Sequence, residues 1–126
     1  MMSNPELTVP TADERRAAVK EFFDQQRQIR RERTLATEAA QIALPMLVEA
    51  CHGKTNQAYH LRALLFSLWN GQPVNLSDKL KLDWELQKAF CTVVLAFGSE
   101  AFFYDEISAA FKEVGLFEWF IAEGEL

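Results

Sequence analysis

The chain has 126 residues, of which 49% are hydrophobic and 25% are charged, and its formal net charge is −5. These values are typical of one globular domain that folds around its own core, and they exclude a disordered chain and a disulfide-stabilised miniature. The N-terminus has no basic segment followed by an apolar stretch, and no run of eighteen apolar residues occurs in the chain, so we expect a cytoplasmic protein.

The N-terminal part predicts a leader and then a basic helix. Residues 1–11 contain two prolines and few apolar groups, so we expect a flexible leader. Thr11 and Glu14 have the spacing of a capping box, in which both side chains satisfy backbone N–H groups at a helix start. The helix region, residues 12–44, carries a narrow apolar stripe, which is typical of a helix that lies over a domain or projects from it.

Pro45 marks the expected border of the helical core domain, residues 45–126. A proline inside a helix lacks the N–H that would bond to the carbonyl four residues earlier, so it kinks or restarts the helix. One long helix and two shorter helices remain alternatives for the N-terminal region.

The clearest helix precedes Gly71. Its apolar residues recur every three or four positions, which places them on one face; they are Leu61, Leu64, Leu65, Leu68 and Trp69. Thr55 or Asn56 can cap its start, and Gly71 followed by Pro73 is typical of a helix end. We predict that this is a core helix.

Further helices follow toward the C-terminus. Residues 76–82 predict one or two helical turns, and Asp83 is a good N-cap for a helix that runs to Phe97. Because residues 91–97 carry no charge, we expect this helix to be buried on most sides. Two shorter helices are predicted over residues 105–114 and 116–121, which gives an all-α bundle of five or six helices.

Catalytic and metal-binding patterns are weak. Cys51, His52 and His60 are the only cluster of potential ligands or nucleophiles, and their spacing matches no known zinc motif. Cys51 and Cys91 lie in apolar helical patterns, so we expect both to be buried thiols. The sequence therefore predicts a protein that is not an enzyme and that needs no metal or cofactor.

Four arginines form the best nucleic-acid signal. They are Arg27, Arg30, Arg31 and Arg33. The first three share one helical face that could follow phosphates. Because the net charge is negative and no second basic patch is evident, we favour a solvated helix face and keep nucleic-acid binding as the alternative.

The C-terminal segment is the best protein-contact signal, because aromatic residues surrounded by acidic ones are typical of interface centres. The candidate contact residues are Phe102, Phe103, Phe117, Glu118, Trp119 and Phe120. The alternative for each aromatic residue is a place in the far wall of the core. A homodimer or a different protein partner would use the same face.

The segment LLFSLWNG (residues 64–71), followed by LSDKLKLD (residues 76–83), resembles a small bacterial domain family of unknown function. The resemblance extends from Leu47 to Phe111. That family occurs in short proteins of plasmids, phages and integrated elements, so the resemblance implies a mobile-element accessory protein but no reaction. We therefore expect a protein-binding accessory protein, with an anti-defence inhibitor of a host defence complex as one specific form, and no membrane association.

Overall fold

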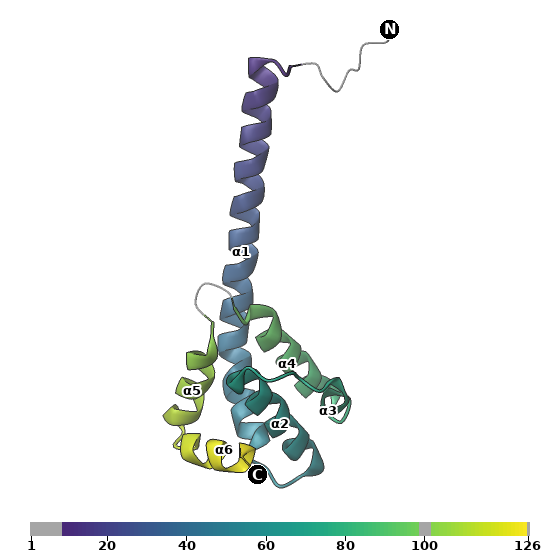
Figure 1. Ribbon diagram of the computed structural model, residues 1–126, viewed down its shortest axis with the longest axis vertical. Coiled ribbons are helices and arrows are strands. Elements are labelled where there is room, and N and C mark those ends of the chain that lie inside the picture. Colours follow the sequence, from purple (N-terminus) through teal and green to yellow (C-terminus); the bar gives the residue numbers. More distant parts are fainter. Residues whose placement is uncertain (1–8, 99–101, 126) are drawn as a thin grey trace. The chain divides into compact units, whose positions relative to one another are not determined.

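The computed structural model describes residues 9–98 and 102–125, and this part of the chain is all-α (Figure 1). The chain divides into two compact units, residues 1–32 and 33–126. The helices are α1 (Ala12–Cys51), α2 (Asn56–Asn70), α3 (Leu76–Lys79), α4 (Trp84–Ala96), α5 (Tyr104–Glu113) and α6 (Phe117–Gly124). The predicted all-α bundle is confirmed. Within these described ranges, no helix is both long enough and apolar enough to span a membrane.

The first unit is the N-terminal part of α1. The Glu14 backbone N–H donates to Thr11 Oγ1 at 3.1 Å, so the predicted cap forms at the helix start. Further along this segment, Val19, Phe22 and Phe23 are exposed within the unit.

Helix α1 is one element that runs through Pro45, which decides between the two alternatives. Ala40 and Leu44 precede the proline and are buried in the core of the second unit. The border of that unit therefore differs from the predicted one at residue 45, because the helix contributes core residues before the proline.

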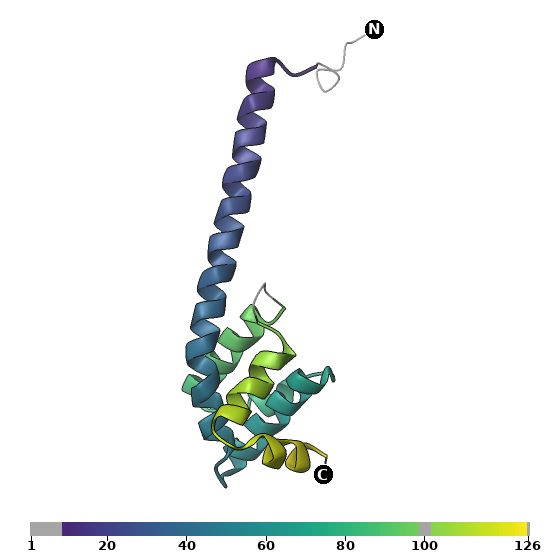
Figure 2. The same cartoon turned by 90° about the vertical axis from the view of Figure 1, so that its left-hand side faces the viewer.

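The core of the second unit lies between α2 and the helices around it. Figures 1 and 2 show α2, α4 and α5 beside the C-terminal part of α1. The predicted start and end of α2 are confirmed: Thr55 Oγ1 accepts from the Ala58 backbone N–H at 3.0 Å, and Gly71 closes the helix with φ of 70°. A left-handed residue at this position suits glycine, which has no Cβ to clash.

Aromatic rings join α5 and α6 to α2. Phe111 of α5 and Phe120 of α6 are fully buried and stack with their ring centroids 3.9 Å apart. The indole N–H of Trp69 on α2 donates to Ser108 Oγ of α5 at 2.7 Å. The C-terminal helices are thus part of the same core.

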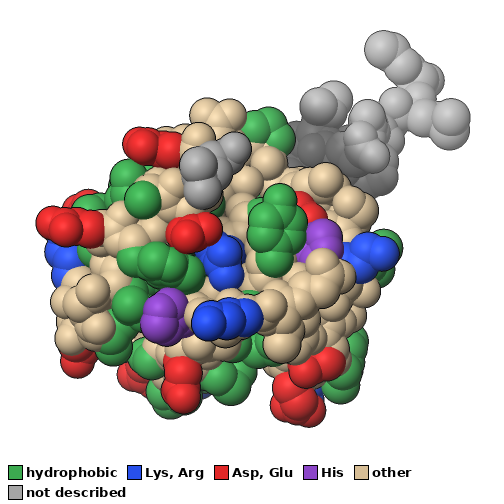
Figure 3. Space-filling view, turned by 90° about the horizontal axis from the view of Figure 1, so that it is seen from below, with side chains coloured by type: hydrophobic (Ala, Val, Ile, Leu, Met, Phe, Trp, Pro, Cys, Tyr) green, Lys and Arg blue, Asp and Glu red, His purple; other side chains and the backbone are tan. Residues whose placement is uncertain are grey.

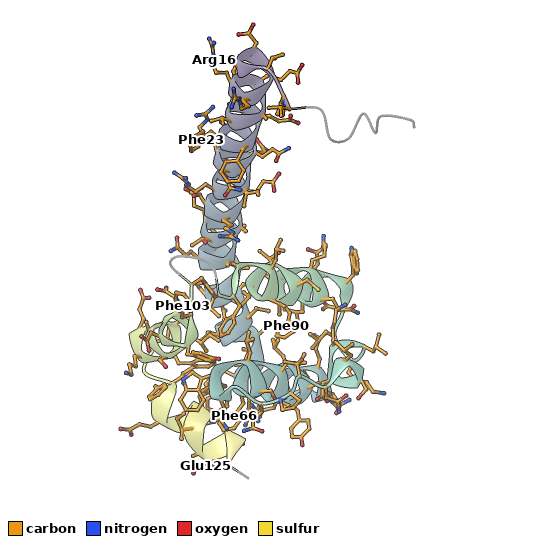
Figure 4. The ribbon with its side chains drawn as sticks, turned by 45° about the horizontal axis from the view of Figure 1, so that its top comes forward. Arg16, Phe23, Phe66, Phe90, Phe103 and Glu125 are labelled. Atoms are coloured by element: carbon orange, nitrogen blue, oxygen red, sulfur yellow. The ribbon has the colours of Figure 1, made fainter. Side chains whose placement is uncertain are left out.

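Helix α4 is amphipathic. The Asp83 carboxylate caps it by accepting from the Leu86 backbone N–H at 2.9 Å, as predicted. Leu86, Phe90 and Val93 are buried, and Figure 4 shows Phe90 on the inner side of the helix, toward α2. The prediction that the uncharged end of this helix is buried on most sides is wrong, because α4 has the core on one face only and its opposite face is exposed.

Candidate protein-binding surface

The outer face of α4 carries apolar side chains where a surface helix normally carries polar ones. Trp84, Lys88, Cys91 and Leu95 follow one another at intervals of four, three and four residues, which aligns them along one side of a helix. All four are exposed, Trp84 to 67% and Leu95 to 78%. The positively charged end of Lys88 lies 5.8 Å from the centroid of the Trp84 ring.

The neighbouring part of α1 has a second stripe with the same intervals. Its residues are Leu35, Ala39, Ile42 and Met46. All are exposed, with Ile42 at 79%. This stripe lies on the side of α1 opposite to the buried Leu44 and Leu47, so α1 also presents one face to the core and a different apolar face to solvent.

A shallow groove of about 420 Å³ lies between α1 and α4 and includes three residues of the α1 stripe but only Lys88 of the α4 stripe. The residues that line it are Ala39, Ile42, Ala43, Met46, Glu85, Lys88, Ala89 and Thr92. We call the two stripes and this groove the α1–α4 face.

The charges on the groove neutralise each other. Lys88 Nζ lies 3.0 Å from Glu85 Oε1, and α4 has no other charged residue. An isolated exposed apolar side chain is ordinary, whereas a contiguous group of them is typical of an interaction site. The arrangement can bind an apolar helix or a flat apolar surface.

The predicted C-terminal contact residues have mixed positions. Phe102 and Phe120 are fully buried, so the prediction that they contact a partner is wrong and they belong to the far wall of the core. Phe117 and Trp119 are half-buried and pack against the core, with Trp69 and Phe117 ring centroids 6.0 Å apart.

Of the predicted C-terminal residues, Phe103 and Glu118 are exposed, Phe103 to 46%. They lie on the loop before α5 and on the first turn of α6, respectively. Of the predicted C-terminal contact surface, only these two side chains are exposed, and they lie on different elements.

Arg62 joins α2 to the end of α1 and to α6. Its guanidinium donates to the backbone carbonyls of Cys51 at 3.2 Å and Gly53 at 3.1 Å, and to Glu123 Oε2 at 3.4 Å. It also lies over the Trp119 ring, 4.9 Å from the centroid. This cluster satisfies carbonyls at a helix end, and we interpret it as structural. In the view from below, hydrophobic, basic, acidic and histidine side chains are interspersed (Figure 3).

The three residues of the predicted catalytic or metal cluster have separate roles. Cys51 is buried, and burial raises the pKa of its thiol to about 12, so it is not a thiolate at neutral pH. The His52 ring packs edge-on against Trp119, with centroids 4.7 Å apart, and His60 Nδ1 lies 2.6 Å from Asp78 Oδ1. Among residues 9–98 and 102–125, no group of three or more His, Cys, Asp and Glu side chains is placed to hold a metal ion.

The arginine cluster lies on α1. Arg27, Arg30, Arg31 and Arg33 are all exposed, and they fall on both sides of the border between the two units. Arg27 pairs with Asp24 one turn earlier. Exposed ion pairs of this kind are weak, so a phosphate could displace the carboxylate.

Comparison with family models gives one informative result. The model of a family of unknown function, DUF7673, matches residues 41–114, which is more than half of the chain. This chain belongs to the DUF7673 family. Comparison with curated proteins and with solved structures gave no match. The predicted resemblance to a family of unknown function is confirmed at that level.

The DUF7673 region includes the last part of α1 and all of α2, α3, α4 and α5, so it contains all of the α4 stripe. It ends before α6 and thus before Phe117, Glu118, Trp119 and Phe120.

The sequence contained a signal for the outer face of α4 that the prediction missed. Trp84 and Leu95 fall opposite to Leu86, Phe90 and Val93 at 100° per residue, so they cannot share one buried face. The lack of charged residues at positions 91–97 predicts burial on most sides, but the helical period of α4 separates a buried inner face from an exposed outer face.

Proposed function

We propose that the chain is a non-enzymatic protein-binding protein and that the α1–α4 face is its contact surface. One observation carries the proposal: the second unit exposes an apolar stripe on α1, another on α4, and a shallow groove between the two helices. Burying Trp84, Ile42 and Leu95 against a partner would remove a large apolar area from water, which is the main driving force of protein association.

The shape of the face favours a helical partner. A shallow groove between two helices that is lined partly by apolar side chains can accept the apolar side of an amphipathic helix. The groove supplies one ion pair, Lys88 with Glu85, at which a polar rim residue of the partner can form a hydrogen bond.

The charge of the whole chain suits a basic partner. A net charge of −5 attracts proteins with basic surfaces and speeds their association. An accessory protein of a mobile element that inhibits a host defence complex by binding it is the specific form that we propose.

The test is affinity capture of the tagged protein from a bacterial lysate, with nuclease treatment and at low and moderate salt. We expect a stoichiometric partner that the Leu95→Glu variant loses and the Leu80→Glu variant keeps. Leu80 is a matched control because it is 73% exposed and lies just after α3, outside the α1–α4 face. Equal capture by the two variants would contradict the proposed surface.

The alternative function is nucleic-acid binding through Arg27, Arg30, Arg31 and Arg33, which are exposed on α1. It predicts that capture depends on nucleic acid and that affinity falls steeply as salt rises, because binding to phosphates releases counterions. Replacing these four arginines with alanine would then abolish capture, whereas Leu95→Glu would not change it.

A further inference from the structure

We propose that the second unit binds a small, soluble phosphate ester in two adjoining hollows beside Arg62. The hollows lie at the start of α2, the turn that follows α1, and α6. They are separate from the α1–α4 face, so this inference does not depend on the proposed protein partner. Figure 3 looks toward this end of the second unit, where basic and histidine side chains lie near hydrophobic ones.

The two hollows share three residues, Tyr59, Arg62 and Glu123. One hollow has a volume of about 360 Å³ and also includes Phe66, and we call it the Phe66 hollow. The other has a volume of about 370 Å³ and also includes Lys54, and we call it the Lys54 hollow. Both volumes fall within the range of small-molecule sites, roughly 300–1,000 Å³.

The Lys54 hollow is rich in basic groups. Lys54 and Arg62 are permanent cations, and His52 lines the same hollow. Lys54 is exposed, and no acidic side chain in residues 9–98 or 102–125 pairs with it. In a chain with a net charge of −5, this hollow therefore attracts anions locally. A phosphate monoester, with a charge of about −2 and three acceptor oxygens at neutral pH, matches several cations better than one carboxylate does.

Arg62 has donors for this phosphate in addition to its structural contacts. Three of its N–H groups are used: they donate to the carbonyls of Cys51 and Gly53 and to the Glu123 carboxylate. A guanidinium has five N–H groups, so two are left for a ligand. The contact with Glu123, at 3.4 Å, is longer than a typical charge-assisted bond of about 2.7–2.9 Å. Glu123 is therefore the partner that a phosphate oxygen can displace.

The start of α2 adds to this attraction. Thr55 lines the Lys54 hollow, and its Oγ1 accepts from the Ala58 backbone N–H at 3.0 Å. The Thr55 O–H is thus available to donate to a phosphate oxygen. Helix α2 has no acidic residue in its first turn, so no carboxylate there offsets the positive end of its dipole.

The Phe66 hollow suits the organic part of the ester. Phe66 and Ala63 provide apolar surface, while Tyr59 and Ser67 carry hydroxyl groups. Gly124 closes this hollow, because a Cβ at that position would collide with the Phe66 ring. Such a mixed lining accepts a group of the size of a sugar or a nucleoside, which makes use of both hollows. Inorganic phosphate alone would leave this hollow unused.

The first test is isothermal titration calorimetry of the full chain at constant ionic strength. The probes are glucose 6-phosphate and adenosine monophosphate, with inorganic phosphate, glucose and adenosine as controls. We expect one ester molecule to bind per chain, at least about tenfold more tightly than inorganic phosphate, because its organic part fills the Phe66 hollow. Glucose and adenosine lack the phosphate and should not bind.

Two variants with opposite expected effects test the charges. Lys54→Gln should weaken ester binding about tenfold, because it removes one cation that holds the phosphate. Glu123→Gln should strengthen binding, because the phosphate no longer competes with a carboxylate for Arg62. The matched controls are Lys81→Gln and Glu118→Gln, which are exposed and lie outside both hollows, and they should stay within about twofold of the unchanged chain. Circular dichroism confirms that each variant is folded.

The indole N–H signals of a ¹⁵N-labelled chain locate the bound ester. Trp119 lines the Lys54 hollow, whereas Trp84 is exposed on α4. Addition of the ester should shift the Trp119 signal and leave the Trp84 signal in place. Trp119→Phe and Trp84→Phe identify the two signals, because each variant loses one of them.

Four outcomes overturn the inference. The first is no heat and no shift of the Trp119 signal with either ester up to roughly 10 mM. The second is equal affinity of Lys54→Gln and Lys81→Gln, and the third is inorganic phosphate that binds as tightly as the esters. The fourth is binding to phosphatidylcholine vesicles that contain phosphatidic acid, with neither soluble ester bound, which would assign the phosphate to a lipid.

Discussion

Arg62 connects three helices through one planar group, and its removal provides a strong test of how the C-terminal helices are held. Arg62→Met keeps an unbranched apolar stem but removes the guanidinium. The lost partners are the carbonyls of Cys51 and Gly53, the Glu123 carboxylate and the Trp119 ring.

The magnitude follows from these contacts. A hydrogen bond to a charged group contributes about 1.5–3 kcal/mol when it is buried, and a cation–π contact about 0.5–2 kcal/mol. The Arg62 side chain is 16% exposed, and water can reach some of the partners after the change, so the contributions do not simply add. We expect a loss of about 3 kcal/mol in the free energy of unfolding, which lowers Tm by roughly 10 °C for a domain of this size.

Urea unfolding followed by far-ultraviolet circular dichroism measures this loss. Arg62→Lys is the control, because it keeps the charge but not the planar fork, and we expect it to retain less than half of the stabilisation. A free energy of unfolding for Arg62→Met within about 0.5 kcal/mol of the unchanged chain, with an unchanged denaturant slope, would refute the role of Arg62 as a connector.

Three further predictions concern the core and the helix ends. Trp69→Phe removes the indole N–H that donates to Ser108 of α5 and should lower the free energy of unfolding by about 1–2 kcal/mol in urea. Adding Ser108→Ala to this variant should cause no further loss, because the hydrogen bond is already broken. Fully additive losses of the two changes would contradict the hydrogen bond. Gly71→Ala places a Cβ at φ of 70° and should cost about 1–2 kcal/mol, whereas Gly53→Ala, where a Cβ meets only ordinary contacts, should change stability by less than about 1 kcal/mol. Burial raises the pKa of the Cys51 thiol from 9.0 to about 12, so the thiol stabilises the fold fully below pH 9 and this stabilisation is lost as pH rises toward 12. In that range the free energy of unfolding should fall by about 1.4 kcal/mol per pH unit because of Cys51. Cys51→Ala should lack this part of the pH dependence, and an equal pH dependence in both proteins would contradict the raised pKa.

The ends of α2 and α4 and the buried face of α2 could be predicted from the sequence, because they depend on local chemistry. Thr55, Gly71 and Asp83 each act where the sequence indicated, because capping depends on one side chain or one backbone angle and its nearest neighbours. The inner face of α2 followed from its period for the same reason.

The placement of the candidate surface did not follow from the sequence. Phe120 and Leu95 are both large apolar residues, and one is fully buried while the other is 78% exposed. Which one meets the core depends on how α6 and α4 pack against distant helices, and local patterns do not contain that information. The helical period showed that α4 has two faces, but only packing shows that the described residues of the second unit leave the outer one exposed.

The stack of Phe120 on Phe111 sets the limits of a usable fragment. A fragment restricted to the family region, residues 41–114, would lose Phe120 and Ala40 while keeping the surfaces that they cover. Phe66 and Phe111 would then be exposed, and an uncovered aromatic surface promotes aggregation. Expression of this domain for crystallisation or for spectroscopy should therefore extend from residue 33 through residue 125, so that the fragment ends where the core ends.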